Sequence, residues 1–333
     1  MRRLLDARLL IALLLIVALD FRASPQIRPP VQFVRAIPLP GVTGRIDHMS
    51  IDLKRRRVWV AALGNGSVEV VSLTGNKVIR SIRDLSEPQG IVSLPDLNMI
   101  AVASGGDGTC TFFDAESLTV TRTLPLGDDA DNIRYDTTQH RLYIGYASGA
   151  LAVIDAPAQR RLADIPLTGH PESFQFDGGN RVFVNVPSSG KIEVVDRTIR
   201  KPVRTFDLTG DRRNFPMAID QGHHRLFIGC RDPARLLILN TDSGTVKARL
   251  TIDGDCDDLF YDHRTQLIFI SCGEGFLDLV KQLTPDQYVV RSRIKTAAGA
   301  RTSLFVPELR QLFLAVPGKS HQPAAIWIYD VTS

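Results

Sequence analysis

The segment RVFVNVPSS, residues 181–189, recurs in altered form six more times along the chain, and the spacing of the copies predicts the fold. The other copies are RVWVAALGN from Arg57, MIAVASGGD from Met99, RLYIGYASG from Arg141, RLFIGCRDP from Arg225, LIFISCGEG from Leu267 and QLFLAVPGK from Gln311. Successive copies begin 40–44 residues apart, and each period contains four short runs of β-forming residues. Such a period is typical of one blade of a β-propeller. The sequence therefore predicts an all-β fold, a seven-bladed β-propeller with four-stranded antiparallel blades.

The two ends of the repeat region indicate how the ring closes. The last copy is followed by only one more strand-like run, which leaves its blade one strand short. VQFVRAIPLPG, residues 31–41, resembles the fourth strands of other repeats but has no blade in front of it. Closure removes sheet edges that would otherwise promote aggregation. We therefore predict that this N-terminal strand closes the last blade, and that residues 31–333 form one propeller domain.

The first thirty residues do not fit the repeat. Basic residues precede an apolar run of eleven residues, Leu9 to Leu19, and a polar break follows it. This layout is typical of a signal peptide, and the run is shorter than the about 20 residues that span a bilayer. We predict a signal peptide at residues 1–23 and a short leader at residues 24–30. The mature chain would then have no transmembrane span and be exported, either periplasmic or secreted, while an uncleaved N-terminal anchor is the alternative.

Four cysteines are too few for a fold that depends on a disulfide framework. Antiparallel pairing of residues 258–261 with residues 267–272 would bring Cys256 close to Cys272. In an oxidising compartment this pairing predicts a candidate disulfide between Cys256 and Cys272, and two buried thiols are the alternative.

Most of the predicted first strands end in an aspartate just before a tight turn. A carboxylate at this position can accept hydrogen bonds from backbone N–H groups of the turn. We therefore interpret these residues as structural and not catalytic. They are Asp52, Asp136, Asp177, Asp220 and Asp262.

The loops of a propeller fall on two faces, and the sequence treats the two faces differently. The links between blades share one face with the loops between second and third strands, and every one of these links differs in sequence. Repeats that vary one set of loops usually bind on that face. The loops of this face carry fifteen acidic and eight basic residues, although the whole chain has a formal net charge of +4. We call it the acidic face, and we expect it to attract a metal ion, an amine or a basic protein segment.

The candidate binding residues lie mainly where the links enter the first strands, because these positions face the mouth of the central channel. They are Arg45, Asp47, His48, Gln89, Asp131, Asn132, His170, Glu172, Arg213, Asn214, Asp257, Asp258 and Arg301. Among them, Glu172, Asn214 and Asp257 are the predicted ligands of a divalent metal ion, calcium, manganese or zinc. His321, in a loop of the last blade, could cover the mouth. The alternative for each residue is a structural bond to a neighbouring blade.

The second strands carry a family resemblance. RVFVNVP, with the runs KIEVVD and LAVIDA, resembles the YVTN-repeat β-propeller family, which includes the YncE-like exported proteins of bacteria. The resemblance covers residues 31–332, although LIFISCG and MIAVASG depart from the Tyr-Val-Thr-Asn core. The family is similar in architecture to seven-bladed lactonases and to quinoprotein and haem d1 propellers. No residue set of those proteins can be carried over position by position, so the resemblance implies a fold and not an activity.

These observations favour an exported, monomeric propeller that binds a small molecule or a protein partner at the acidic face, without established catalysis. One alternative is a lactonase-like hydrolase that depends on a divalent metal at the same channel mouth. Another is an accessory protein of periplasmic redox or quinoprotein pathways. No Walker, dinucleotide-binding, G-x-S-x-G or H-E-x-x-H motif is found. The near-neutral charge argues against nucleic acid as the partner.

Overall fold

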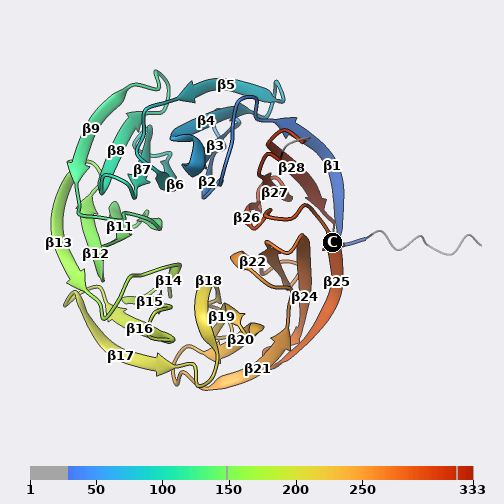
Figure 1. Cartoon of the computed structure of the whole chain (residues 1–333). Coiled ribbons are helices and arrows are strands. Elements are labelled where there is room, and N and C mark those ends of the chain that lie inside the picture. The colour runs from blue at the N-terminus through green and yellow to red at the C-terminus, as the bar shows by residue number, and fades with distance from the viewer. Residues whose placement is uncertain (1–28, 148, 320–321, 333) are drawn as a thin grey trace, which may run out of the picture.

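The computed structural model describes residues 29–147, 149–319 and 322–332, and it forms a ring of seven blades around a central channel (Figure 1). Each blade is a sheet of four antiparallel strands, and the four strands of a blade follow one another in space from the channel to the rim. The predicted fold class is therefore confirmed. The predicted signal peptide, most of the leader and His321 lie outside the described residues.

Strands of the same rank occupy equivalent places in all blades. The first strands, next to the channel, are β2 (Met49–Asp52), β6 (Pro88–Leu94), β10 (Ile133–Asp136), β14 (Phe174–Phe176), β18 (Arg212–Asp220), β22 (Cys256–Asp262) and β26 (Thr302–Val306). The second strands are β3 (Arg57–Ala62), β7 (Met99–Ser104), β11 (Arg141–Tyr146), β15 (Arg181–Val186), β19 (Arg225–Asp232), β23 (Leu267–Cys272) and β27 (Gln311–Val316). The seven repeated segments thus form the second strands.

The two outer strands complete each blade. The third strands are β4 (Ser67–Ser72), β8 (Thr109–Asp114), β12 (Ala150–Asp155), β16 (Lys191–Asp196), β20 (Ala234–Asn240), β24 (Phe276–Thr284) and β28 (Ala325–Val331). The fourth strands are β5 (Lys77–Ile82), β9 (Val120–Pro125), β13 (Arg160–Pro166), β17 (Lys201–Asp207), β21 (Val246–Thr251), β25 (Gln287–Lys295) and β1 (Val31–Pro38). A single 3-10 turn, η1 (Leu63–Asn65), is the only helical element among the described residues. No helix in this part of the chain is long and apolar enough to cross a membrane.

Burial of the second strands explains why the repeated segment is rich in apolar and aromatic residues. In six of the seven copies the third residue is aromatic, and each of these side chains is buried. They are Trp59, Tyr143, Phe183, Phe227, Phe269 and Phe313. The apolar residues of neighbouring blades form seven clusters, one at each boundary between two blades. Burial of an apolar side chain contributes about 1.5–3 kcal/mol, so the blade boundaries are the main source of stability.

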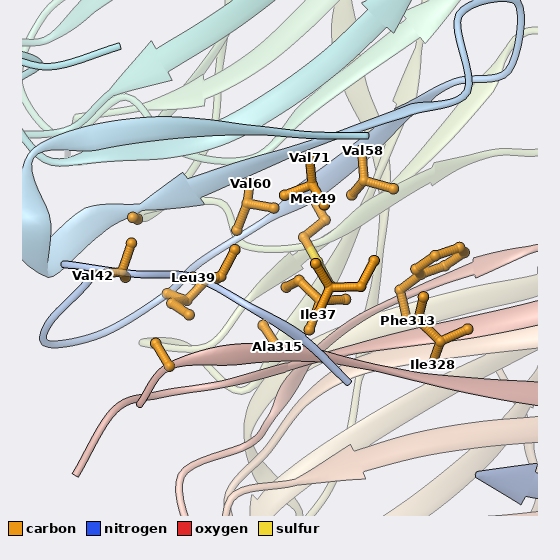
Figure 2. Packing of buried hydrophobic residues seen from close by; sticks show 14 of the residues in the cluster. Ile37, Leu39, Val42, Met49, Val58, Val60, Val71, Phe313, Ala315 and Ile328 are labelled. Atoms are coloured by element: carbon orange, nitrogen blue, oxygen red, sulfur yellow. The ribbon is translucent and has the colours of Figure 1, made fainter. Parts of the chain in front are cut away.

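The ring closes as the sequence predicts. β1 pairs antiparallel with β28, from Val31 opposite Val331 to Pro38 opposite Ala325. Ile37 of β1 then packs with Val58 of the first blade and Phe313 of the last (Figure 2). The N-terminal strand therefore belongs to the last blade and also contributes to its boundary with the first.

The strand-ending aspartates have the structural role that the sequence predicts. All five accept hydrogen bonds from backbone N–H groups of the following turn, with donor–acceptor distances of 2.8–3.3 Å. Several also pair with an arginine, as Asp177 does with Arg181 at 2.7 Å. These aspartates lie at the turns opposite the acidic face.

The candidate disulfide requires a correction. Cys256 and Cys272 are opposite each other in the register of β22 and β23, as predicted, but all four cysteines are free, buried thiols. The register shifts between Cys256 and Asp258, and the Cys256 Sγ lies 3.8 Å from the carbonyl oxygen of Cys230 in the preceding blade. The Cys272 Sγ instead contacts the carbonyl oxygen of Ile270 at 3.7 Å. The two sulfur atoms therefore contact different carbonyl groups and form no bond with each other.

Candidate functional site

Three cavities follow one another along the central channel. The middle one, which we call the constriction, has a volume of about 20 Å³, and it lies between a vestibule of about 210 Å³ and a lower cavity of about 560 Å³. The constriction shares Asp131 and Glu172 with the vestibule, and His48 and Asp258 with the lower cavity. A space of this size holds about one water molecule or one monatomic ion.

The start of each first strand contributes one residue to the wall of the constriction or the vestibule. These seven ring residues are Asp47, Gln89, Asp131, Glu172, Phe215, Asp257 and Arg301. Backbone hydrogen bonds to the second strand hold them in place, and in three blades the N–H of the ring residue donates to a carbonyl group at 2.8–3.0 Å. The pairs are Asp47 with Ala61, Asp131 with Gly145 and Glu172 with Asn185. Each blade therefore places one variable side chain at the wall of the constriction, of the vestibule or of both.

A glycine allows two of these blades to approach closely. A Cβ atom on Gly90 would collide with the carbonyl oxygen of Asp131. It would also lie only 3.0 Å from the Ile133 side chain. Gly90 follows the ring residue Gln89, so a larger residue there would displace Asp131 from the channel wall.

The constriction is strongly acidic. Five carboxylates and one arginine, Arg45, line it. The carboxylates are Asp47, Asp131, Glu172, Asp257 and Asp258. Burial raises the pKa of Asp131 well above its ordinary range, and the nearby Glu172 and Asp47 carboxylates raise it further. Burial, with Asp257 and Asp47, likewise raises the pKa of Glu172 to about 8. Burial and mutual repulsion therefore disfavour the ionised state of these carboxyl groups unless a cation lies among them.

Four buried polar atoms at the constriction have no hydrogen-bond partner among the described residues. They are the Asp47 Oδ2, His48 Nδ1, Asp131 Oδ1 and Asn132 Oδ1 atoms. The His48 Nδ1 atom lies 3.6 Å from Asp47 Oδ1 and 3.9 Å from Asp131 Oδ1. Asp47, Asp131 and Asn132 are 2%, 6% and 3% exposed, respectively. Buried polar groups are almost always satisfied, and this arrangement can accept a ligand that offers positive charge or hydrogen-bond donors.

A second group of residues borders the vestibule. Asp131, His170 and Glu172 can each offer one atom within 4.8 Å of the others, as can Asp47, His48 and Asp131 in the constriction. The His170 Nδ1 atom lies 2.7 Å from the carbonyl oxygen of Ala147 and 3.6 Å from Asp129 Oδ2. Asp131 therefore belongs to both groups of potential metal ligands.

Asp257 differs from the other carboxylates because arginines already neutralise it. Arg231 donates a hydrogen bond to its carboxylate, and the Arg301 Nε atom lies 3.0 Å from it. Arg231 is also stacked on Phe215, with its guanidinium carbon 3.9 Å from the ring centre. The pKa of Asp257 is still raised, because the effect of burial is larger than the opposing effect of the Arg231 charge.

Eleven of the thirteen predicted binding residues line the constriction or the vestibule. The exceptions are Arg213 and Asn214, so the predicted metal ligands Glu172, Asn214 and Asp257 do not form one site. Asn214 is buried and donates to Asn185 Oδ1 at 2.9 Å and to the carbonyl oxygen of Lys191 at 3.0 Å. Arg213 is exposed. The register of β18 shifts between Asn214 and Met217, and this irregularity places Phe215 at the channel.

Five residues of the site are absent from the thirteen predicted binding residues: Asp129, Ser173, Phe215, Arg231 and Thr302. Phe215 follows the predicted Asn214 directly, and an apolar residue in an acidic ring gave no chemical signal. Arg231 lies inside the repeated segment RLFIGCRDP, in the second strand β19, and its contact with Asp257 of the next blade depends on how the blades pack. A basic residue at the seventh position of this segment, where no other copy has one, was the available signal.

Comparisons with known proteins agree on the fold and do not identify a family. No family model matches the sequence, and no curated protein matches it. The hydrazine synthase of Kuenenia stuttgartiensis is similar, with a TM-score of 0.74 and 13% identity over 86% of this chain and 98% of that one.

Two further solved structures are similar over most of their length. A chain of the mitotic checkpoint complex gives a TM-score of 0.76 and 15% identity, covering 97% of this chain and 99% of that one. The WD40 repeats of RRP9 give a TM-score of 0.78 and 11% identity, covering 90% and 98%. At such low identity the likeness establishes the propeller fold alone.

Proposed function

We propose that this protein is a binding propeller whose ligand is a divalent cation held in the constriction by Asp47, His48, Asp131 and Asn132. The observation that carries the proposal is the convergence of four unpartnered, buried polar atoms on a space of about 20 Å³. We further propose that the protein is an exported member of the YVTN-repeat family.

The donor set favours particular metals. Two carboxylates, one amide oxygen and one imidazole nitrogen combine hard oxygen ligands with a nitrogen ligand. Calcium and magnesium prefer oxygen ligands alone, whereas manganese and zinc accept imidazole. We therefore expect manganese or zinc to bind more tightly than calcium.

The first prediction tests this site by calorimetric titration of chelator-treated protein with manganese, zinc and calcium chloride. Asp131→Asn should weaken manganese binding at least about tenfold, which corresponds to roughly 1.4 kcal/mol, because it removes a charged ligand. Asp107→Asn is the matched control, since Asp107 is an exposed aspartate in another loop of the acidic face. Equal loss in both variants would mean that general acidity and not the constriction attracts the cation. Absence of manganese and zinc binding in the parent would refute the proposal.

One observation favours a second candidate, metal-dependent hydrolysis. The vestibule of about 210 Å³ opens onto the constriction, so a small molecule could reach a cation bound there. A metal ion in such a position could polarise a carbonyl group or activate water. This candidate requires the same cation, so failure of the titration would remove it as well.

A further inference from the structure

The vestibule contains a second group of ligand atoms beside the proposed cation. Asp131, His170 and Glu172 line this cavity and offer atoms within 4.8 Å of one another. Of these three residues, only Asp131 also belongs to the group in the constriction. The two groups lie on either side of one shared carboxylate.

His170 has the surroundings of a metal ligand. Its Nδ1 atom lies 2.7 Å from the carbonyl oxygen of Ala147, which can accept a hydrogen bond but cannot donate one. This contact selects the tautomer with the proton on Nδ1 and leaves the lone pair on Nε2 free. Metal-binding histidines typically donate their other ring N–H to a carbonyl or carboxylate group in this way.

Glu172 and Asp131 are the carboxylates that arginine does not neutralise at this level of the channel. Arg231 and Arg301 contact Asp257, and the Glu172 carboxylate accepts no hydrogen bond from any residue that the structure describes. The Asp131 Oδ1 atom is buried and likewise has no hydrogen-bond partner there. Two carboxylates that accept no hydrogen bond from arginine, and an oriented imidazole, therefore line the same cavity.

We propose that the channel holds a second divalent cation, bound by Asp131, His170 and Glu172, so that Asp131 bridges two metal ions. The inference rests on the proposed function, because Asp131 is also a ligand of the first cation. Paired metal ions with a shared carboxylate are typically about 3.5–4 Å apart, and a single carboxylate can span such a distance with its two oxygens.

The test counts manganese ions bound to the chelator-treated chain, by calorimetry and by electron paramagnetic resonance of the free and bound ion. The parent should bind two ions per chain, with the bound pair showing the altered spectrum of coupled manganese centres. His170→Gln and Glu172→Gln should each reduce the count to one and restore the spectrum of an isolated ion. His48→Gln should remove the other ion, and Asp131→Asn should weaken both.

The control is His223→Gln, because His223 pairs with Asp220 at a turn of the opposite face and should leave both ions in place. Circular dichroism spectra identify any variant that does not fold, and the independent His170 and Glu172 variants then still decide the outcome. One ion per chain that persists in both variants would overturn the second position while leaving the first intact. A parent chain that binds no ion would overturn both proposals.

Discussion

At the scale of single residues, the aspartates of the constriction differ from those at the opposite turns in how their oxygen atoms are satisfied. The strand-ending aspartates at the opposite turns accept backbone hydrogen bonds and contact arginines, so their charge is compensated. The aspartates of the constriction lack such partners for the Asp47 Oδ2 and Asp131 Oδ1 atoms. The same residue type is therefore structural at one end of β10 and available for a ligand at the other.

Asp278 provides a pH-dependent prediction away from the channel. It is buried in β24, and burial is the main cause that raises the pKa of its carboxyl from 3.8 to about 6. Between these two values the folded state binds more protons than the unfolded state, so the stability falls as the pH rises through this window. Asp278→Asn should abolish that part of the dependence and should be more stable than the parent at pH 7.

Urea unfolding at pH 4.5, 5.5 and 7 would measure this effect. The Asp278→Asn variant keeps an acceptor oxygen for the backbone N–H of Asp253, which lies 2.7 Å from the Asp278 carboxylate. A constant difference in unfolding free energy between parent and variant at all three pH values would contradict the assignment.

Residue-level prediction from the sequence placed the channel residue correctly in every blade except the fifth. Asp47, Asp131 and Glu172 start regular first strands, and counting along the repeat placed them correctly at the channel. In the fifth blade the register shift after Asn214 moves the channel position by one residue, to Phe215. Such an irregularity depends on packing around Pro216 and has no reliable signature in one sequence.

At the scale of the elements, β1 connects the last blade to the first. It supplies the fourth strand of the last blade, and its Ile37 side chain enters the cluster shared with the first blade (Figure 2). The sequence predicted the pairing because residues 31–41 resemble other fourth strands. It did not predict the cross-blade contact, which depends on the angle between the two blades.

Shortening the Ile37 side chain tests its contact with the first blade. Ile37→Ala should reduce the free energy of unfolding by about 2–5 kcal/mol, because it leaves a cavity at a closed boundary. Val34→Ala, in the same strand, should cost less than about 1 kcal/mol, since Val34 is 41% exposed. Chemical denaturation of both variants measures the difference, and similar losses would mean that β1 stabilises the ring only through its backbone.

At the scale of the whole molecule, the seven blades bring residues from distant parts of the chain to one axis. Asp47 and Asp257 are separated by 210 positions in the sequence, yet both line the constriction. A cation that contacts several blades stabilises the closed ring, because a ligand that binds only the folded state shifts the folding equilibrium. The channel therefore links ligand binding to the integrity of the propeller.

The thermal stability should report this link. Free manganese at 100 times its dissociation constant should stabilise the fold by about 2.7 kcal/mol, which raises the melting temperature by roughly 5 °C for a chain of this size. Scanning calorimetry of the parent with manganese, and again after excess chelator, would measure the gain and its reversal. Asp131→Asn, whose binding is at least about tenfold weaker, should show at most about half of this gain at the same manganese concentration, and an equal shift in that variant would locate the cation elsewhere.

The closing blade also determines how the ring responds to force. Val31 is opposite Val331, so the outer ends of β1 and β28 lie side by side. Tension applied between the two termini would break the hydrogen bonds of this pair one after another, as a zipper opens, because the load falls on one bond at a time. Strands pulled along their length would instead resist with all their bonds together. The seam that completes the propeller is thus its mechanically weakest line, and a protein pulled from both ends would open there before the other six blades are disturbed.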